Sequence, residues 1–102
     1  MYKYFPKTKE ELVEIIKAEV NKKGWNCDLN HIDVSQITDM SYLFNGYCGY
    51  GLEEFNGDIS RWDVSNVKNM SHMFDGAKSF NQPIGDWDVS NVTNMYGMFE
   101  CA

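Results

Sequence analysis

Cysteine is scarce in this 102-residue sequence, and the three that occur (Cys27, Cys48 and Cys101) form neither a CxxC motif nor a cluster with histidine. An odd number of widely spaced cysteines argues against a disulfide framework and against a structural zinc site. We therefore expect neither a bound metal nor another cofactor.

Long apolar runs and an excess of positive charge are missing as well. No apolar stretch approaches the roughly 18 residues that span a bilayer, so we expect no membrane insertion. The N-terminal residues, MYKYFPKTKEEL, lack the apolar core of a signal peptide and leave a cytoplasmic location open. A formal net charge of −6 disfavours binding to nucleic acid.

What the sequence does contain is an internal repeat. Residues 55–77 and 80–102 are identical at 14 of 23 positions, and residues 25–47 match 55–77 at nine of 23. Self-similarity at this spacing is typical of a solenoid, in which each unit buries its apolar face against its neighbours. The chain therefore divides, as one domain, into a leader and three units: residues 1–24, 25–54, 55–79 and 80–102.

Within each unit the spacing predicts a short strand and then a short helix. Ile59-x-x-Trp62-x-Val64 has the L-x-x-L-x-L form of a leucine-rich repeat, and the alternation of Trp62 and Val64 fits a strand. The string NMSHMF, which begins at Asn69, places its apolar residues on one helical face. We therefore predict an α/β fold, a short leucine-rich-repeat-like solenoid of three coils.

The leader is predicted to be a separate capping helix. Thr8 and Glu11 have the spacing of a capping box, and Gly24 follows two lysines where a helix would end. An uncovered end of a repeat stack would be an exposed apolar slab, so we expect this helix to cover the first unit. Its apolar side chains recur on one face: Leu12, Val13, Ile16 and Val20.

The repeated unit resembles a known family. The string W-D-V-S-N-V-x-N-M occurs twice, and residues 25–102 are similar to the repeat of BspA-like leucine-rich repeat proteins of bacterial surfaces. The resemblance implies a non-catalytic protein-recognition or adhesion module, on the cell surface or secreted. It implies a host protein, a bacterial surface protein or a glycan as partner. The alternative is a purely structural segment, a stalk or scaffold of a longer surface protein with no ligand of its own.

The core is predicted from apolar positions that recur among the units. Trp62 and Trp87 are assigned to the core rather than to sugar stacking, because Ile32 holds their place in the first unit. The predicted core residues are Ile32, Val34, Phe55, Ile59, Trp62, Val64, Val67, Met70, Met73, Phe74, Phe80, Ile84, Trp87, Val89 and Val92.

Three aspartates, Asp33, Asp63 and Asp88, recur at one place in the units. Each carboxylate could accept N–H groups of its own DVSN turn, or the three could form a stripe that binds a cation or ligand. The turn is favoured because glycine-rich calcium repeats are absent. His31 and His72 align with unrelated residues, so we expect them to face solvent. No nucleophile has a matching base, which argues against an enzyme.

Two groups of residues are candidates for binding. Arg61, Asp63, Asp86 and Asp88 lie on the predicted concave strands, and Tyr47 and Tyr50 lie in GYCGYGLEE, the insertion that breaks the period. This insertion is either a recognition loop or a tolerated surface insertion.

The third unit would leave an apolar end uncovered. We therefore expect either further repeats beyond this stretch or a homodimer through the C-terminal coil, most simply a two-fold dimer.

Overall fold

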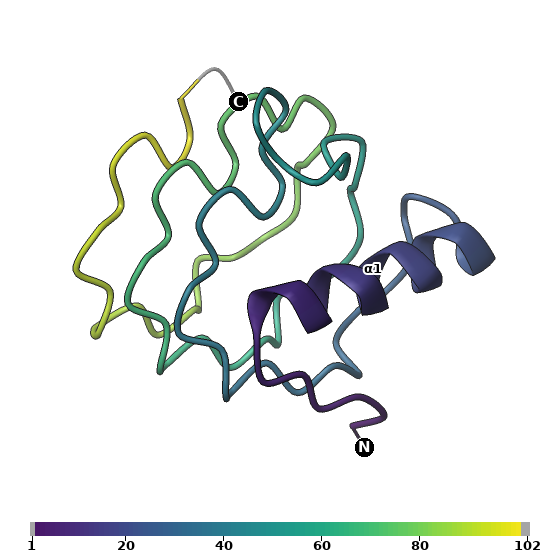
Figure 1. Cartoon of the computed structure of the whole chain (residues 1–102), viewed down its shortest axis with the longest axis horizontal. Helices are drawn as coiled ribbons and strands as arrows, with labels where there is room; N and C mark the ends of the chain where they lie inside the picture. Colours follow the sequence, from purple (N-terminus) through teal and green to yellow (C-terminus); the bar gives the residue numbers. More distant parts are fainter. Residues whose placement is uncertain (1, 101–102) are drawn as a thin grey trace.

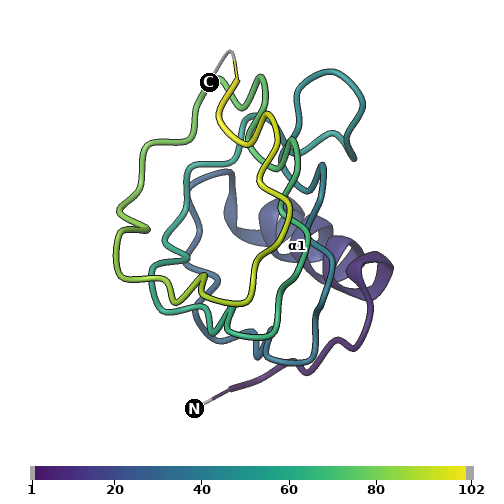
Figure 2. The same ribbon diagram turned by 90° about the vertical axis from the view of Figure 1, so that its left-hand side faces the viewer.

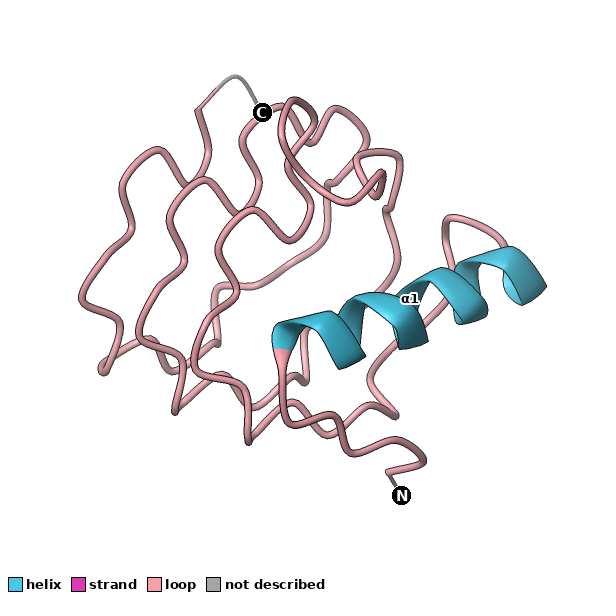
Figure 3. Cartoon of the chain, in the orientation of Figure 1, coloured by secondary structure: helices cyan, strands magenta, loops and turns pink. Residues whose placement is uncertain are grey.

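The computed structural model describes residues 2–100 and has one regular element, the helix α1 (Lys9–Lys23). The described residues contain no strand (Figure 3), and parallel pairing is limited to isolated bridges between Tyr4 and Ile32, Asp39 and Asn69, and Asn69 and Asn94. No helix in the described part of the chain is long and apolar enough to cross a membrane.

The predicted leader helix is confirmed. The Thr8 side chain accepts a hydrogen bond from the backbone N–H of Glu11 at 3.1 Å, which caps the first turn of α1. Glu11 reaches back to the N–H of Lys7, and Gly24 ends the helix with a positive φ of 96°. Leu12, Val13 and Ile16 are buried, and Val20 is half-buried against the same core.

The three units lie side by side, and α1 covers the first of them while the third lies at the opposite end (Figures 1 and 2). Backbone hydrogen bonds join the units at equivalent positions. Met40 donates to the carbonyl of Asn69 at 2.9 Å, and Met70 donates to the carbonyl of Asn94 at 2.8 Å. The donors within residues 40–46 and 70–76 are Met40, Tyr42, Phe44, Gly46, Met70, His72, Phe74 and Gly76.

The predicted fold class is wrong. An α/β leucine-rich-repeat-like solenoid needs a strand and a helix in every coil, but Trp62–Val64 and Met70–Phe74 both lie in turns and irregular chain. The described chain, with extents of 32 × 25 × 23 Å, is a compact globule rather than a three-coil superhelix. The repeat in the sequence therefore specifies how units pack, without specifying regular secondary structure inside them.

A left-handed residue in every unit explains why no helix forms there. Tyr42, His72 and Gly97 occupy equivalent positions and have φ values of 62°, 55° and 65°. A residue in this region interrupts a right-handed helix, and side chains other than glycine rarely adopt it. The methionines and phenylalanine at helical spacing are still buried in the first two units, but the segment that carries them is not a helix. Its successive peptide groups alternate in direction.

The direction of the peptide groups explains why no strand forms. In a parallel sheet, successive peptide groups point alternately to the two neighbouring strands. Here every second peptide group spans the units, and the groups between them close local turns, as where Met73 donates to the carbonyl of Met70. In the other half of the unit, Trp62 and Val67 donate to carbonyls three residues earlier, so that half is also a series of turns.

Stacked aromatic rings fill the core between the units. Phe44 and Phe74 stack with ring centroids 5.5 Å apart, and Phe74 and Phe99 stack at 5.4 Å. Trp62 and Trp87 are nearly parallel at 6.4 Å. Their indole N–H groups donate across the units to the carbonyls of Leu29 and Ile59, respectively. The assignment of both tryptophans to the core is confirmed.

The remaining core prediction is confirmed in full for the first two units. In the third unit Trp87 is buried, and Phe80, Ile84, Val89 and Val92 are half-buried against the core. The difference follows from position, because the described chain places no unit on the far side of the third.

We predict that Trp62→Ala lowers the free energy of unfolding by about 3–5 kcal/mol, because it removes a buried ring between two units. Trp62→Phe keeps a ring but leaves the Leu29 carbonyl without its indole donor, and should cost about 1–3 kcal/mol. Urea denaturation of the three proteins measures both values. Equal stability of Trp62→Ala and the parent chain would contradict the assignment.

Candidate functional site

The residues that the sequence assigned to a concave strand face lie outside any strand. Arg61, Asp63, Asp86 and Asp88 are exposed and directly flank the buried Trp62 and Trp87 in turns and irregular chain. The backbone N–H of Arg61 donates to the side chain of Asn30 in the neighbouring unit at 2.9 Å. Because these residues lie in turns, the concave strand face on which they were expected does not exist.

The recurring aspartates stabilise their own turns, as predicted. Asp33, Asp63 and Asp88 each accept the backbone N–H two residues later, at 3.0–3.1 Å. The hydroxyls of Ser65 and Ser90 also donate to Asp63 and Asp88 at 2.6 Å. The hydroxyl of Ser90, together with its N–H, holds the pKa of Asp88 below its usual value. These carboxylates are thus engaged within the fold.

The insertion is anchored at both ends. The Asn45 side chain accepts hydrogen bonds from the N–H groups of Tyr47 and Cys48, and Leu52 is buried in the core. Tyr47 is 69% exposed, and its ring lies against Gly76 of the next unit. The insertion therefore presents an exposed aromatic surface, as recognition would require. Its role in recognition stays a prediction.

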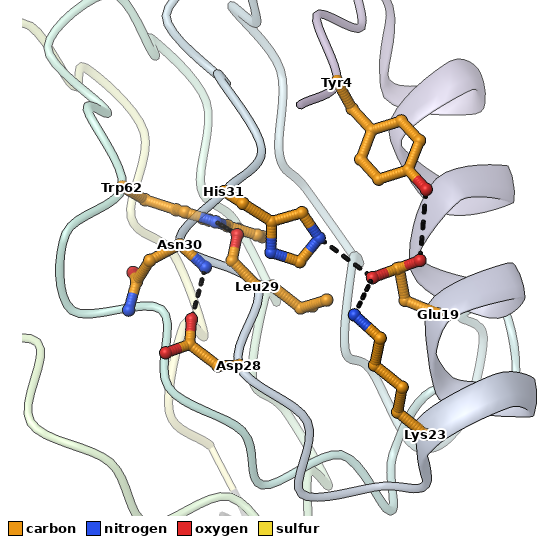
Figure 4. Close-up of polar contacts among 8 residues, drawn as sticks. All are labelled: Tyr4, Glu19, Lys23, Asp28, Leu29, Asn30, His31 and Trp62. Carbon is orange, nitrogen blue, oxygen red and sulfur yellow. Dashed lines mark hydrogen bonds and ion pairs between the residues drawn. The ribbon is translucent and has the colours of Figure 1, made fainter. Parts of the chain in front are cut away.

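A polar cluster that the sequence did not reveal joins α1 to the first unit (Figure 4). Glu19 is buried, and its carboxylate contacts His31 Nε2 at 2.9 Å, Lys23 Nζ at 3.0 Å and the Tyr4 hydroxyl at 3.2 Å. The prediction that both histidines face solvent is wrong, because the side chains of His31 and His72 are each 22% exposed and paired with a carboxylate. No spacing in the sequence marks Glu19, which sits on an otherwise apolar helical face.

The partners of Glu19 decide its charge. Burial alone would raise the pKa of Glu19, but hydrogen bonds from Lys23, His31 and Tyr4 outweigh it and leave the pKa below its usual value. The same contact raises the pKa of the Tyr4 hydroxyl. Glu19 is therefore an ionised structural anchor between α1 and the first unit.

Lys9 covers the edge of the first unit. Its ammonium group donates to the backbone carbonyl of Ser41 at 3.0 Å and to the Ser41 hydroxyl at 3.1 Å. It also pairs with Asp39 at 3.3 Å and lies 5.8 Å from the centre of the Tyr50 ring. Lys9 thus supplies a donor to the side of the first unit that has no preceding unit.

The opposite edge is open, and we call it the outer edge: residues 93–100 of the third unit. It carries three large exposed apolar side chains, Met95 (42%), Tyr96 (75%) and Phe99 (54%). The backbone N–H groups of Met95, Gly97 and Phe99 have no acceptor among residues 2–100. Exposed apolar groups beside unpaired backbone groups form a surface suited to association.

One group of side chains beside this edge has the chemistry to ligate a metal. His72, Asp75 and Glu100 each offer a ligand atom, and these atoms lie within 4.8 Å of one another. His72 Nδ1 is 3.1 Å from Asp75 Oδ2, and the His72 ring stacks on Tyr42. Of the cysteines, Cys27 is buried and Cys48 exposed, both as free thiols, and Cys101 lies outside the described residues.

The arrangement as a whole offers surfaces rather than a cavity. The described residues form no pocket. What residues 2–100 offer a ligand is the outer edge, the exposed turns and the anchored insertion.

One comparison with known proteins gives a match. The model of the family described as "Mycoplasma protein of unknown function, DUF285" matches residues 13–102, which includes most of α1 and all three units. No curated protein and no solved structure matches the chain.

We predict that Glu19→Gln lowers the free energy of unfolding at neutral pH by about 1.5–3 kcal/mol, because it removes charge-assisted hydrogen bonds. Since the folded pKa of Glu19 lies below its ordinary value of 4.5, this contribution is present above that value. It is lost as the pH falls through the folded pKa, so the two proteins should converge in acid.

The matched control is Glu14→Gln, an exposed position on the same helix. Chemical denaturation at several pH values should show little effect of this control. A Glu19→Gln deficit that stays constant from neutral to acidic pH would contradict the role of the ionised carboxylate.

Proposed function

We propose that this chain, which belongs to the DUF285 family of unknown function, is a non-catalytic protein-recognition or adhesion module. The resemblance of its repeat to BspA-like bacterial surface proteins supports this proposal. The same resemblance supports a location on the cell surface or outside the cell. The proposed partner is a protein surface, with a glycan as the second choice.

The observation that carries the proposal is the outer edge. Tyr96, Met95 and Phe99 are exposed together on a segment whose backbone N–H groups lack acceptors in the described chain. Aromatic and methionine side chains are enriched in protein interfaces, and Tyr contributes strongly when a partner buries it. Protein partners suit this edge better than small molecules, which usually require a concave pocket.

The proposal is of a non-catalytic module, and the contacts of the recurring serines and of the histidines support it. The serines that repeat along the units donate to aspartates of their own turns, as Ser65 does to Asp63. His31 and His72 each pair with a carboxylate, Glu19 and Asp75 respectively. In the described chain, neither arrangement hydrogen-bonds a histidine ring to a serine hydroxyl, the pair that commonly activates a serine nucleophile.

The alternative is a structural segment of a longer surface protein. The outer edge continues the contacts that join the three units, so it could serve a scaffold as readily as a receptor. The two functions differ in whether the isolated domain binds a molecule of another kind.

We predict that Tyr96→Glu lowers affinity for a surface-protein ligand by about tenfold or more, because it places a charge on the binding edge. The ligand would come from an array of host proteins, bacterial surface proteins and glycans probed with the folded chain. Tyr47→Glu is the matched comparison, since Tyr47 is similarly exposed but lies on the insertion. Binding is then measured by surface plasmon resonance.

A loss of affinity confined to Tyr47→Glu would show that the binding site lies on the insertion rather than on the outer edge. If no array component binds the folded parent chain, the structural alternative is favoured over recognition.

A further inference from the structure

In one stretch of each unit, all backbone hydrogen bonds to the next unit have the same direction. From residue 39 to 46 the first unit gives only N–H groups to the second, and the second gives only N–H groups to the third over the equivalent stretch. Tyr42 donates to Ser71 at 3.1 Å, and His72 donates to Tyr96 at 2.9 Å. The carbonyl of each joining peptide faces the preceding unit, so the peptide dipoles are aligned across the fold.

This direction makes the outer edge a row of donors. The N–H groups of Met95, Gly97 and Phe99 correspond to those of Met70, His72 and Phe74, which donate to the third unit. The carbonyls of Met95 and Gly97 already accept local bonds from Met98 and Glu100. A partner must therefore supply carbonyl oxygens at every second residue to satisfy this row.

The rest of the third unit offers acceptors in the same register. In the second unit the carbonyls of Ile59, Ser65 and Lys68 accept cross-unit bonds from Trp87 Nε1, Asn91 Nδ2 and the backbone of Thr93. The equivalent carbonyls of the third unit, those of Ile84, Ser90 and Thr93, receive no cross-unit donor among residues 2–100. A partner that fits both rows must carry a tryptophan and an asparagine at the spacing found in the repeat. These must be followed by a backbone N–H equivalent to that of Thr93.

Two other occupants fit poorly. A two-fold dimer through this edge would set the N–H row of one copy against the N–H row of the other. The acceptor edge of a second copy is covered by α1, because Lys9 already donates to the Ser41 carbonyl. The homodimer expected from the sequence is therefore disfavoured by the direction of the backbone.

We propose that the outer edge binds, in parallel orientation, a segment with the repeat's own W-D-V-S-N-V-x-N-M-x-x-M-F pattern from another polypeptide. This inference rests on the proposed recognition function and names its partner class. The contact continues the interface that already joins the second and third units, including the stack of Phe74 on Phe99. The partner's phenylalanine would extend that stack.

The test uses the full chain, labelled with nitrogen-15, and an unlabelled synthetic peptide with the sequence of residues 80–100. Amide hydrogen exchange is followed by NMR as the peptide concentration is raised to saturation. We expect exchange to slow by about tenfold or more at Met95, Gly97 and Phe99. Asn94, Tyr96 and Met98, whose N–H groups are already bonded, should change less.

Two controls sharpen the test. A peptide with Trp87→Phe lacks the indole donor for the Ile84 carbonyl and should bind several-fold more weakly. The chain variant Met95→Glu, at a 42% exposed position, should lose the protection without loss of fold. Light scattering of the free chain at high micromolar concentration should show a monomer.

Failure of the inference is distinguishable from failure of the proposed function. Peptide binding that shifts signals of Tyr96 and Phe99 but leaves the three exchange rates unchanged would overturn the inference and leave recognition at this edge standing. No binding by the peptide, or a two-fold dimer of the free chain, would also overturn the inference. The recognition function itself fails only if the array finds no partner for the parent chain.

Discussion

The hydrogen bonds between backbone groups of successive units are the interaction on which the rest of this structure depends. They join residues 40–46 to 69–75 and residues 70–76 to 94–100, with one bond at every second residue. Because both rows have the same spacing, they hold equivalent side chains opposite one another. The phenylalanine stack and the tryptophan pair follow from this register.

The first and third units differ in how their outward-facing edges are covered, and this difference is the basis of the functional proposal. At the first unit, α1 supplies Lys9 to a backbone carbonyl and Glu19 to a cluster with Tyr4, Lys23 and His31. At the third unit, the described chain supplies no such cover, and apolar side chains and N–H groups are exposed together. A surface with both features can gain from burial and from backbone pairing when a partner arrives.

The sequence was sufficient for the features that depend on pattern and local chemistry. Thr8 and Gly24 marked the ends of α1, the repeat marked the units, and the DVSN string marked the turns at Asp63 and Asp88. Trp62 was assigned to the core because an isoleucine replaces it in the first unit. The helix ends and the turns depend on residues a few positions apart, and the units and the core depend on comparing equivalent positions of the repeat.

The absence of strands and helices from the units could not be predicted, because it depends on contacts between neighbouring units. Met70, Met73 and Phe74 have helical spacing, but His72 between them has a positive φ that its residue type does not suggest. At the equivalent position of the third unit, Gly97 is the one residue whose type suggests a positive φ. Tyr42 and His72, at that position in the other two units, do not suggest it. Glu19 was missed for a similar reason, since its partners Tyr4 and His31 lie far away in sequence.

The most direct test of the account is the detection of scalar couplings across hydrogen bonds by NMR on the chain labelled with carbon-13 and nitrogen-15. The structure predicts couplings from the amide nitrogens of Met70, His72 and Phe74 to the carbonyl carbons of Asn94, Tyr96 and Met98, respectively. Couplings from Phe74 to the carbonyl of Met70, four residues earlier, would instead show a helix in the second unit and contradict the account.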